Sequence, residues 1–549
     1  MRKRSVRVLW AICSVALLAA LGGCVEAGEP LRLRGLAAVV VCSSLDARML
    51  SDGTAPAAAA LARRGGAAIV VRAVGDEPLR ASSPGRDVRF VDAGDAAEDP
   101  AGVDAAIAQA AREAGGGTVV LVSQTGTTGL VVVTGAGVPE GLLSSRRTHR
   151  AGLLTATDVA EVVRALEDAK SGQQIALRVH PRRGAVSLLA ALQAYAAAAA
   201  EAQAPIIVGF SVLAGVSVLG SWLLAGRAGT RYWQLVAYRA LMLALSVPPA
   251  TLAARLMDRY PASVPRVLAL VLGGAGVLWV LATAVAERRG AATGLAALVA
   301  TSCAAVVLDQ VFGAPLAPGT AFSYAPLAGF RFYGIGNEGA AVALGSWLAA
   351  AALAMRSDRA ARLGVLILGA VTVAVCSFPL AGANSLVALW GTVLVATFAL
   401  AATRRSITAR DAAGICLAAI AGLALVVVAE RVTGAGTHVG TAIAAGRGPL
   451  GVVAGRLAAV VRAYAAHPAA LAGFAAWGLL AYVWWRPPAP LKAAFTARPN
   501  VRAAATAALA GGLVAAVVED SSVVVMVLLA LYAGAAITGG VLDGMEGGW

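Results

Sequence analysis

The chain has 549 residues, is 59% hydrophobic and has a mean hydropathy of +0.76, values that exclude an ordinary soluble protein and predict a polytopic membrane protein. The formal net charge is +15. Most arginines lie between apolar segments, where they orient a membrane protein, so we do not expect nucleic acid as a partner. The six cysteines include no C-x-x-C spacing. We therefore predict neither a metal site nor a cofactor.

Residues 1–24 predict a signal peptide. A basic start is followed by an apolar stretch at 8–21, which ends in Leu21-Gly22-Gly23-Cys24. This ending resembles a lipobox, so Cys24 is a candidate lipidation site. The alternative is an uncleaved signal anchor. In both cases we expect the next domain to lie outside the cytoplasm.

Residues 25–183 are less apolar and predict a separate extracytoplasmic α/β domain. The expected elements are a strand at 37–42, a helix at 55–64, strands at 67–71 and 88–91, a helix at 103–113, strands at 118–122 and 130–133, and a helix at 157–168. Alternating strands and helices predict a parallel sheet. The alanine-rich residues 184–203 predict a helical linker into the membrane.

Parts of this domain resemble the alkaline phosphatase superfamily. Ser43-Ser44-Leu45-Asp46 after the first strand, followed by Thr54-Ala55-Pro56 and residues 61–65, resembles the start of that family's domains, where a strand leads to an Asp and a helix follows. Residues 131–139 resemble its late "VVxGPGV" strand, and residues 153–160 resemble its "xxTDxAPT" segment. The resemblance covers about residues 37–170 and implies an alkaline-phosphatase-like fold.

The metal-binding residues of that family are largely missing. Val122-Ser123-Gln124-Thr125-Gly126 stands where the family has an Asp-His pair. Asp46, Asp158 and His149 alone do not supply the ligands of a two-metal site. The resemblance therefore implies a degenerate, non-catalytic domain, or pseudoenzyme, with a binding or regulatory role.

Residues 204–540 predict an all-α transmembrane bundle of about eleven helices. The expected spans are 204–225, 233–253, 264–285, 291–312, 334–354, 361–378, 385–402, 411–429, 468–485, 502–518 and 522–540. Alternate loops are rich in arginine, which places them and the tail at 541–549 in the cytoplasm. We expect a multi-pass protein of the bacterial cytoplasmic (inner) membrane.

Four polar motifs interrupt the apolar segments, all on the predicted extracytoplasmic side: residues 330–338, 379–385, 430–438 and 519–522. Charge at membrane level is costly and usually functional. The candidate residues for binding a substrate or handling protons and ions are Arg331, Asn337, Glu338, Asn384, Arg431, His438, Glu519 and Asp520. The alternative is structural: Asn337 can cap a helix that carries Glu338 in its first turn, and Glu519 and Asp520 can form a polar helix end.

The longest outer loop, at about 430–467, has a segment at 450–464 that predicts a helix in the membrane interface. Arg447, Arg456 and Arg462 are candidates for contact with lipid headgroups.

The motifs "FYGIGNE", "PLxGAN" and a late "ED", joined to an outer domain, resemble an uncharacterised family of bacterial multi-pass membrane proteins. In this chain they are residues 332–338, 379–384 and 519–520. This resemblance implies the architecture and names no reaction.

The sequence favours a cell-envelope protein that transports or gates an anionic or lipid-linked substrate at its extracytoplasmic face. Membrane lipids and a lipid-linked envelope intermediate are the expected partners. A membrane-embedded transferase acting on a polyprenyl-linked glycan is an alternative, because carboxylates beside arginines suit both chemistries. A non-catalytic envelope scaffold is the other alternative, so enzymatic activity stays open.

Overall fold

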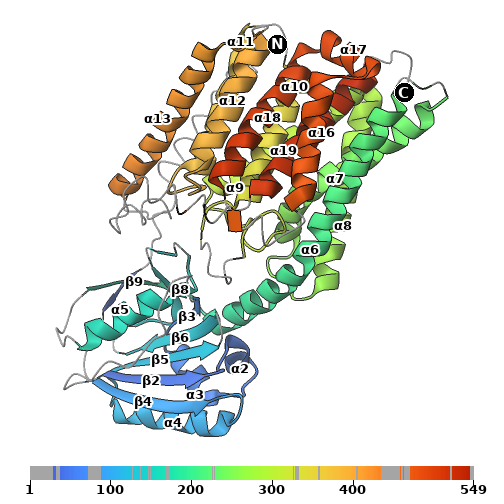
Figure 1. Ribbon diagram of the computed structural model, residues 1–549. Helices are drawn as coiled ribbons and strands as arrows, with labels where there is room; N and C mark the ends of the chain where they lie inside the picture. The colour runs from blue at the N-terminus through green and yellow to red at the C-terminus, as the bar shows by residue number, and fades with distance from the viewer. Residues whose placement is uncertain are drawn as a thin grey trace.

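The computed structural model has a sheet domain and a helical bundle joined by one long helix (Figure 1). It describes residues 29–32, 37–71, 88–125, 128–135, 138–145, 147–148, 150–167, 174–225, 227, 229–325, 327, 333–355, 359–403, 406–433, 455, 458, 461–462, 470–519 and 522–543. The predicted leader and Cys24 lie outside these ranges.

The strands are β1 (Glu29–Arg32), β2 (Ala37–Ser43), β3 (Gly65–Val71), β4 (Val88–Asp95), β5 (Thr118–Thr125), β6 (Thr128–Thr134), β7 (Gly141–Ser145), β8 (Leu153–Thr155) and β9 (Gln174–Pro181). Within the described residues they form one nine-stranded sheet in the order β1-β9-β7-β8-β3-β6-β5-β2-β4. The five strands and three helices predicted for this domain are all present.

The sheet is mixed, which corrects the prediction of a parallel sheet. β2 pairs in parallel with β4 and β5, but β6 runs antiparallel to both β5 and β3. Thr125 at the end of β5 faces Thr128 at the start of β6. A connection this short can join only antiparallel neighbours, because parallel strands need a long crossover.

Helices cover both faces of the sheet. One face packs against α2 (Ala47–Ser51), α3 (Pro56–Ala62), α4 (Pro100–Glu113) and the start of α6, and the other packs against α5 (Ala156–Glu167). Neighbouring strand residues alternate between the two cores, as Val39 and Val40 do. Burial on both faces explains why the central strands are continuous apolar runs.

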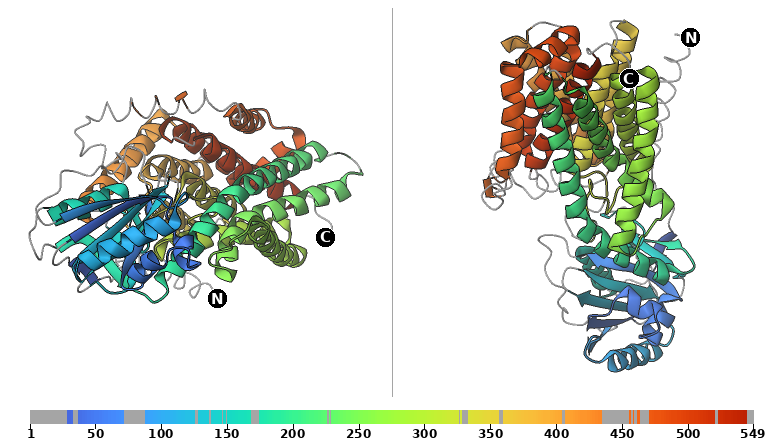
Figure 2. Two further views of the ribbon diagram at one scale, coloured as in Figure 1. Left: turned by 90° about the horizontal axis from the view of Figure 1, so that it is seen from below. Right: turned by 90° about the vertical axis from the view of Figure 1, so that its right-hand side faces the viewer.

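The helix α6 (Ala185–Leu224) joins the two parts. Its 40 residues span roughly 60 Å, about twice the thickness of a bilayer core. Ala185 and Leu189 are buried in the sheet domain, whereas Val212 and Val216 lie exposed on the bundle. The predicted linker and first span are therefore one continuous helix, visible in both views of Figure 2.

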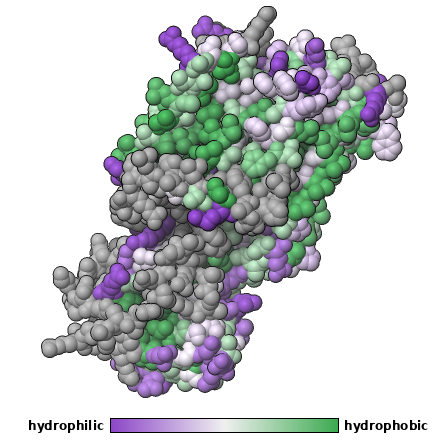
Figure 3. Space-filling model, viewed as in Figure 1, coloured by the Kyte–Doolittle hydropathy of each residue, from purple (hydrophilic) through white to green (hydrophobic). Residues whose placement is uncertain are grey.

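The other bundle helices are α7 (Arg231–Met257), α8 (Val264–Arg289), α9 (Ala291–Val311), α10 (Asn337–Ala354), α11 (Arg359–Ser377), α12 (Val387–Thr403), α13 (Ala409–Thr433), α16 (Ala470–Trp485), α17 (Ala489–Ala497), α18 (Pro499–Val518) and α19 (Ser522–Asp543). Each predicted span contains a helix. In the part of the chain that the structure describes, eight helices are long and apolar enough to cross a membrane. Apolar residues cover much of the visible bundle surface, as expected against lipid (Figure 3). The chain is an integral, multi-pass membrane protein.

The helices alternate in direction, so the bundle has a domain-facing end and an opposite end (Figure 1). The ends of α8 and α19 meet at the opposite end, where Gly290 lies beside Asp543, the last described residue. The described parts of all four polar motifs lie at the domain-facing end, and this shared placement agrees with the sequence prediction.

Candidate functional site

The first two polar motifs dock against each other at the domain-facing end. The backbone N–H of Ile335 donates to the carbonyl of Gly382 at 2.6 Å. Gly334 has a φ of +82°, and a Cβ atom there would lie 2.2 Å from the same carbonyl oxygen. Only glycine combines this backbone with so close an approach. The two motifs thus form one folded unit.

Two asparagines lock this unit. Asn384 Nδ2 donates to Asn337 Oδ1 at 2.7 Å, and both side chains are buried. Gly336 is the N-cap of α10 and Asn337 is its first residue. The expected capping role of Asn337 is therefore replaced by a contact across the bundle. Glu338 stays in the first turn of α10, where the helix dipole favours its carboxylate.

The third motif contributes a buried carboxylate from the last turn of α13. Ser385 Oγ donates to Glu430 Oε1 at 2.9 Å, and Glu430 is only 5% exposed. Arg431, the predicted site residue, lies exposed. Consecutive helical residues point about 100° apart, so burial of one favours exposure of the other.

The fourth motif contributes Glu519, the C-cap residue of α18. Glu519 is 2% exposed, and its Oε1 accepts a hydrogen bond of 2.9 Å from Trp390 Nε1. Trp390 is itself fully buried in the first turn of α12.

These contacts converge on the amino end of α12. We call the six residues the α12 cluster: Asn337, Asn384, Ser385, Trp390, Glu430 and Glu519. They come from α10, α12 with the turn before it, α13 and the end of α18. Ser385 and Trp390 are separated by roughly 7 Å along a helix, so both carboxylates lie near the positive end of the α12 dipole. The cluster therefore places two carboxylates where the helix dipole favours negative charge.

The cluster unites Asn337, Asn384 and Glu519 from the predicted set. It adds Ser385, Trp390 and Glu430, none of which was predicted as a site residue. Glu430 was recognisable as a carboxylate that ends an apolar helix, whereas nothing in the sequence distinguishes Trp390 from a core residue. Arg462 lies exposed on a helical segment. The predicted residues outside the described ranges are Cys24, Arg331, His438, Arg447, Arg456 and Asp520.

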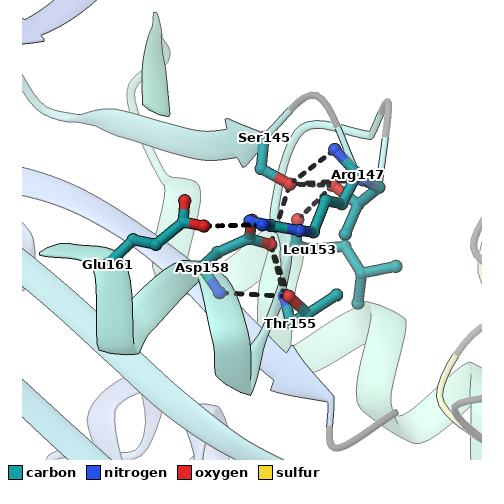
Figure 4. A network of polar contacts seen from close by, with 7 residues as sticks. Ser145, Arg147, Leu153, Thr155, Asp158 and Glu161 are labelled. Atoms are coloured by element: carbon teal, nitrogen blue, oxygen red, sulfur yellow. Dashed lines mark hydrogen bonds and ion pairs between the residues drawn. The ribbon is translucent and has the colours of Figure 1, made fainter. Parts of the chain in front are cut away.

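Asp158, a key residue of the alkaline phosphatase resemblance, is the centre of a polar network in the sheet domain (Figure 4). It is 2% exposed, and its Oδ2 accepts from Ser145 Oγ and from both the N–H and Oγ1 of Thr155, each at 2.8 Å. Arg147 bridges Asp158 Oδ1 and Glu161 Oε1. Here Asp158 fixes the start of α5 against β7 and β8.

Fold and site together define a multi-pass membrane protein. It has an appended mixed-sheet domain and a buried polar cluster at the domain-facing end of its bundle. No family model, curated protein or solved structure matches the chain. Among the described residues, no group of three or more His, Cys, Asp or Glu is placed to hold a metal ion.

Proposed function

We propose that this protein transports or gates an anionic or lipid-linked substrate of the bacterial cell envelope, with the α12 cluster as its working site. One observation carries the proposal: Glu430 and Glu519, from separate helices, are both buried and both hydrogen-bonded to the amino end of α12. Buried carboxylates in a membrane protein are costly, and they commonly mark proton or ion pathways.

The geometry supports a mechanism of gating by protonation. A proton on Glu430 or Glu519 would weaken the hydrogen bond from Ser385 or Trp390, because charged acceptors make the stronger bonds. α13 lies at the edge of the bundle and packs chiefly on α12, with Leu417 and Leu425 exposed (Figure 1). Release of Glu430 would therefore loosen the end of α13 beside the sheet domain.

We further propose that the domain-facing end is extracytoplasmic and that the membrane is the cytoplasmic membrane. The support is the charge distribution: at the opposite end, Arg288 and Arg289 end α8 and Arg486 follows α16.

In this account the sheet domain is a non-catalytic relative of the alkaline phosphatase superfamily that senses or delivers the substrate. Its support is Asp158, whose oxygens already accept hydrogen bonds from Ser145, Arg147 and Thr155. A carboxylate engaged in this way serves the fold.

The test compares the extracted lipids of wild-type cells with those of cells that lack the protein, by mass spectrometry combined with surface labelling. We expect an anionic or polyprenyl-linked species to accumulate without the protein, with a smaller share at the cell surface. An unchanged lipid profile and distribution would overturn the proposal. If instead a modified lipid is missing from these cells and the share of lipid at the cell surface is unchanged, the result would contradict transport and identify a transferase.

A further inference from the structure

A cavity of about 320 Å³ lies where the sheet domain meets the bundle. Its walls come from the turn before β8, the first half of α6, the end of α7 and the loop at 313–327. Tyr333, Gly334, Leu380 and Ala381 of the two docked motifs complete it. The cavity therefore joins three parts of the fold that are far apart in the sequence.

The charge of the lining has one sign. Four arginines line the cavity, namely Arg150, Arg182, Arg255 and Arg259, and no Asp or Glu does so among the described residues. Four cations around a small volume create a positive potential that attracts an anion.

Arg255 is the central feature of this cavity. It is 6% exposed, and its guanidinium carbon lies 4.1 Å from the ring centre of Tyr195 and 5.1 Å from that of Tyr260. Its Nε and Nη1 atoms make no hydrogen bond to any residue that the structure describes and are covered by protein, so Arg255 lines the cavity with the remaining part of its side chain. A buried guanidinium with unused donors is costly, unless a ligand accepts from it.

An acidic group near Arg255 is already engaged. Asp309 lies within electrostatic range of Arg255, but its carboxylate accepts from the backbone N–H groups of Leu316 and Ala317 at 2.8 and 3.0 Å. No ion pair between Asp309 and Arg255 occurs among the described residues. Asp309 thus shapes the loop that forms the cavity wall and does not pair with Arg255.

Arg150 connects the sheet domain to this loop. Its Nη2 donates to the carbonyl of Ala314 at 2.9 Å and to the hydroxyl of Tyr324 at 3.1 Å. The sheet domain is thereby anchored on the wall that faces Arg255, so a ligand in the cavity would contact both parts of the protein.

We propose that this cavity binds the phosphate group of an anionic ligand, with Arg255 as the principal contact. A guanidinium N–H group donates a charge-assisted hydrogen bond to a phosphate oxygen, and Tyr195 and Tyr260 hold the guanidinium plane in place. Leu188, Leu192 and Ala196 give the cavity an apolar side, which suits the remainder of an amphiphile. The phosphate has two candidate sources, a lipid headgroup and a free phosphate. This site is separate from the α12 cluster and does not depend on its proposed role in transport.

The test uses the full-length protein in phosphatidylcholine nanodiscs. Thermal unfolding is followed while phosphatidylglycerol is added to the nanodiscs or, in a second arm, inorganic phosphate is added to the buffer. Arg255→Gln removes the proposed contact. Arg239→Gln is the matched control, because Arg239 lies on the same helix, pairs with Glu287 and does not line the cavity. Ala196→Phe retains Arg255 and fills the cavity, which guards against a folding defect in Arg255→Gln.

We expect saturable stabilisation of the wild type and of Arg239→Gln, with apparent affinity reduced about tenfold or more in Arg255→Gln and Ala196→Phe. A response to phosphatidylglycerol alone identifies a lipid headgroup, and a response to inorganic phosphate identifies a free phosphate. Equal responses of the wild type, Arg255→Gln and Ala196→Phe, or no response in either arm, would overturn the proposal whatever the outcome for transport.

Discussion

Asn384 donates its side-chain amide to Asn337 at 2.7 Å, although the two residues belong to different motifs that are 47 positions apart. This bond joins the turn before α12 to the start of α10, and the adjoining Ser385 and nearby Trp390 hold the two buried carboxylates. The contact between the two amides therefore lies next to the residues that hold the carboxylates of the α12 cluster.

Replacement of either asparagine should lower the stability of the protein. Asn384→Ala leaves the buried Asn337 oxygen without this donor, and we expect a loss of roughly 1–3 kcal/mol in unfolding free energy. The double variant with Asn337→Ala should cost less than the sum of the two single changes. Thermal unfolding of the purified proteins measures all three, and strict additivity would show that the bond contributes little.

Gly334→Ala should be poorly tolerated. The new Cβ would lie 2.2 Å from the Gly382 carbonyl oxygen, at a φ of +82°. We expect a large fall in folded protein, measured by size-exclusion chromatography in detergent. Gly276→Ala is the matched control, because its Cβ meets open space within α8, and alanine is favoured in helices by about 1 kcal/mol. Equal yields of the two variants would refute the close docking of the motifs.

The sheet domain should lose stability in acid through Glu161. The hydrogen bond from Arg147 holds the pKa of Glu161 below its usual value near 4.5. A lowered folded pKa contributes stability that is fully present above the unfolded pKa and is lost as the pH falls through the folded pKa. Glu161 is partly exposed, so we expect a small effect.

The measurement is the unfolding temperature of the full-length wild type and Glu161→Gln between about pH 6 and pH 3. The two curves should converge as the pH falls. Parallel curves over the whole range would mean that the interaction of Glu161 with Arg147 adds nothing to the stability of the protein.

The orientation is testable at the two ends of α13. Thr433→Cys lies exposed at the domain-facing end and Ala409→Cys lies exposed at the opposite end. A membrane-impermeant maleimide should label Thr433→Cys in intact cells and Ala409→Cys only after lysis. Native Cys42 will give little background, because burial raises its pKa to about 11. Cys416 is exposed on α13, so both variants are made in a Cys416→Ala background. The reverse labelling pattern would invert the proposed topology.

The helices were predictable because runs of apolar residues of membrane length have few other stable structures. The strands β2, β3, β5 and β6 were predictable for a similar reason, since burial on both faces leaves continuous apolar segments. The strands β1, β7, β8 and β9 carry no such run. The pairing direction of neighbouring strands depends on connections that residue patterns do not reveal.

The candidate site was predictable at the level of motifs but not of partners. Asn337, Asn384 and Glu519 interrupt apolar segments and are therefore visible in the sequence. Ser385 and Trp390 act through contacts with residues 45 and 129 positions away. Arg255 is an ordinary arginine at a helix end until the fold brings Tyr195 and the sheet domain over it.

The most direct test of the central claim is complementation of cells that lack the protein, with the lipid species that accumulates in those cells as the readout. Glu519→Gln and Glu430→Gln remove the two buried charges, and Glu113→Gln is an exposed control in the sheet domain. Our account predicts that all three proteins reach the membrane and that only Glu113→Gln restores the wild-type lipid profile. Full restoration by both Glu519→Gln and Glu430→Gln would contradict it.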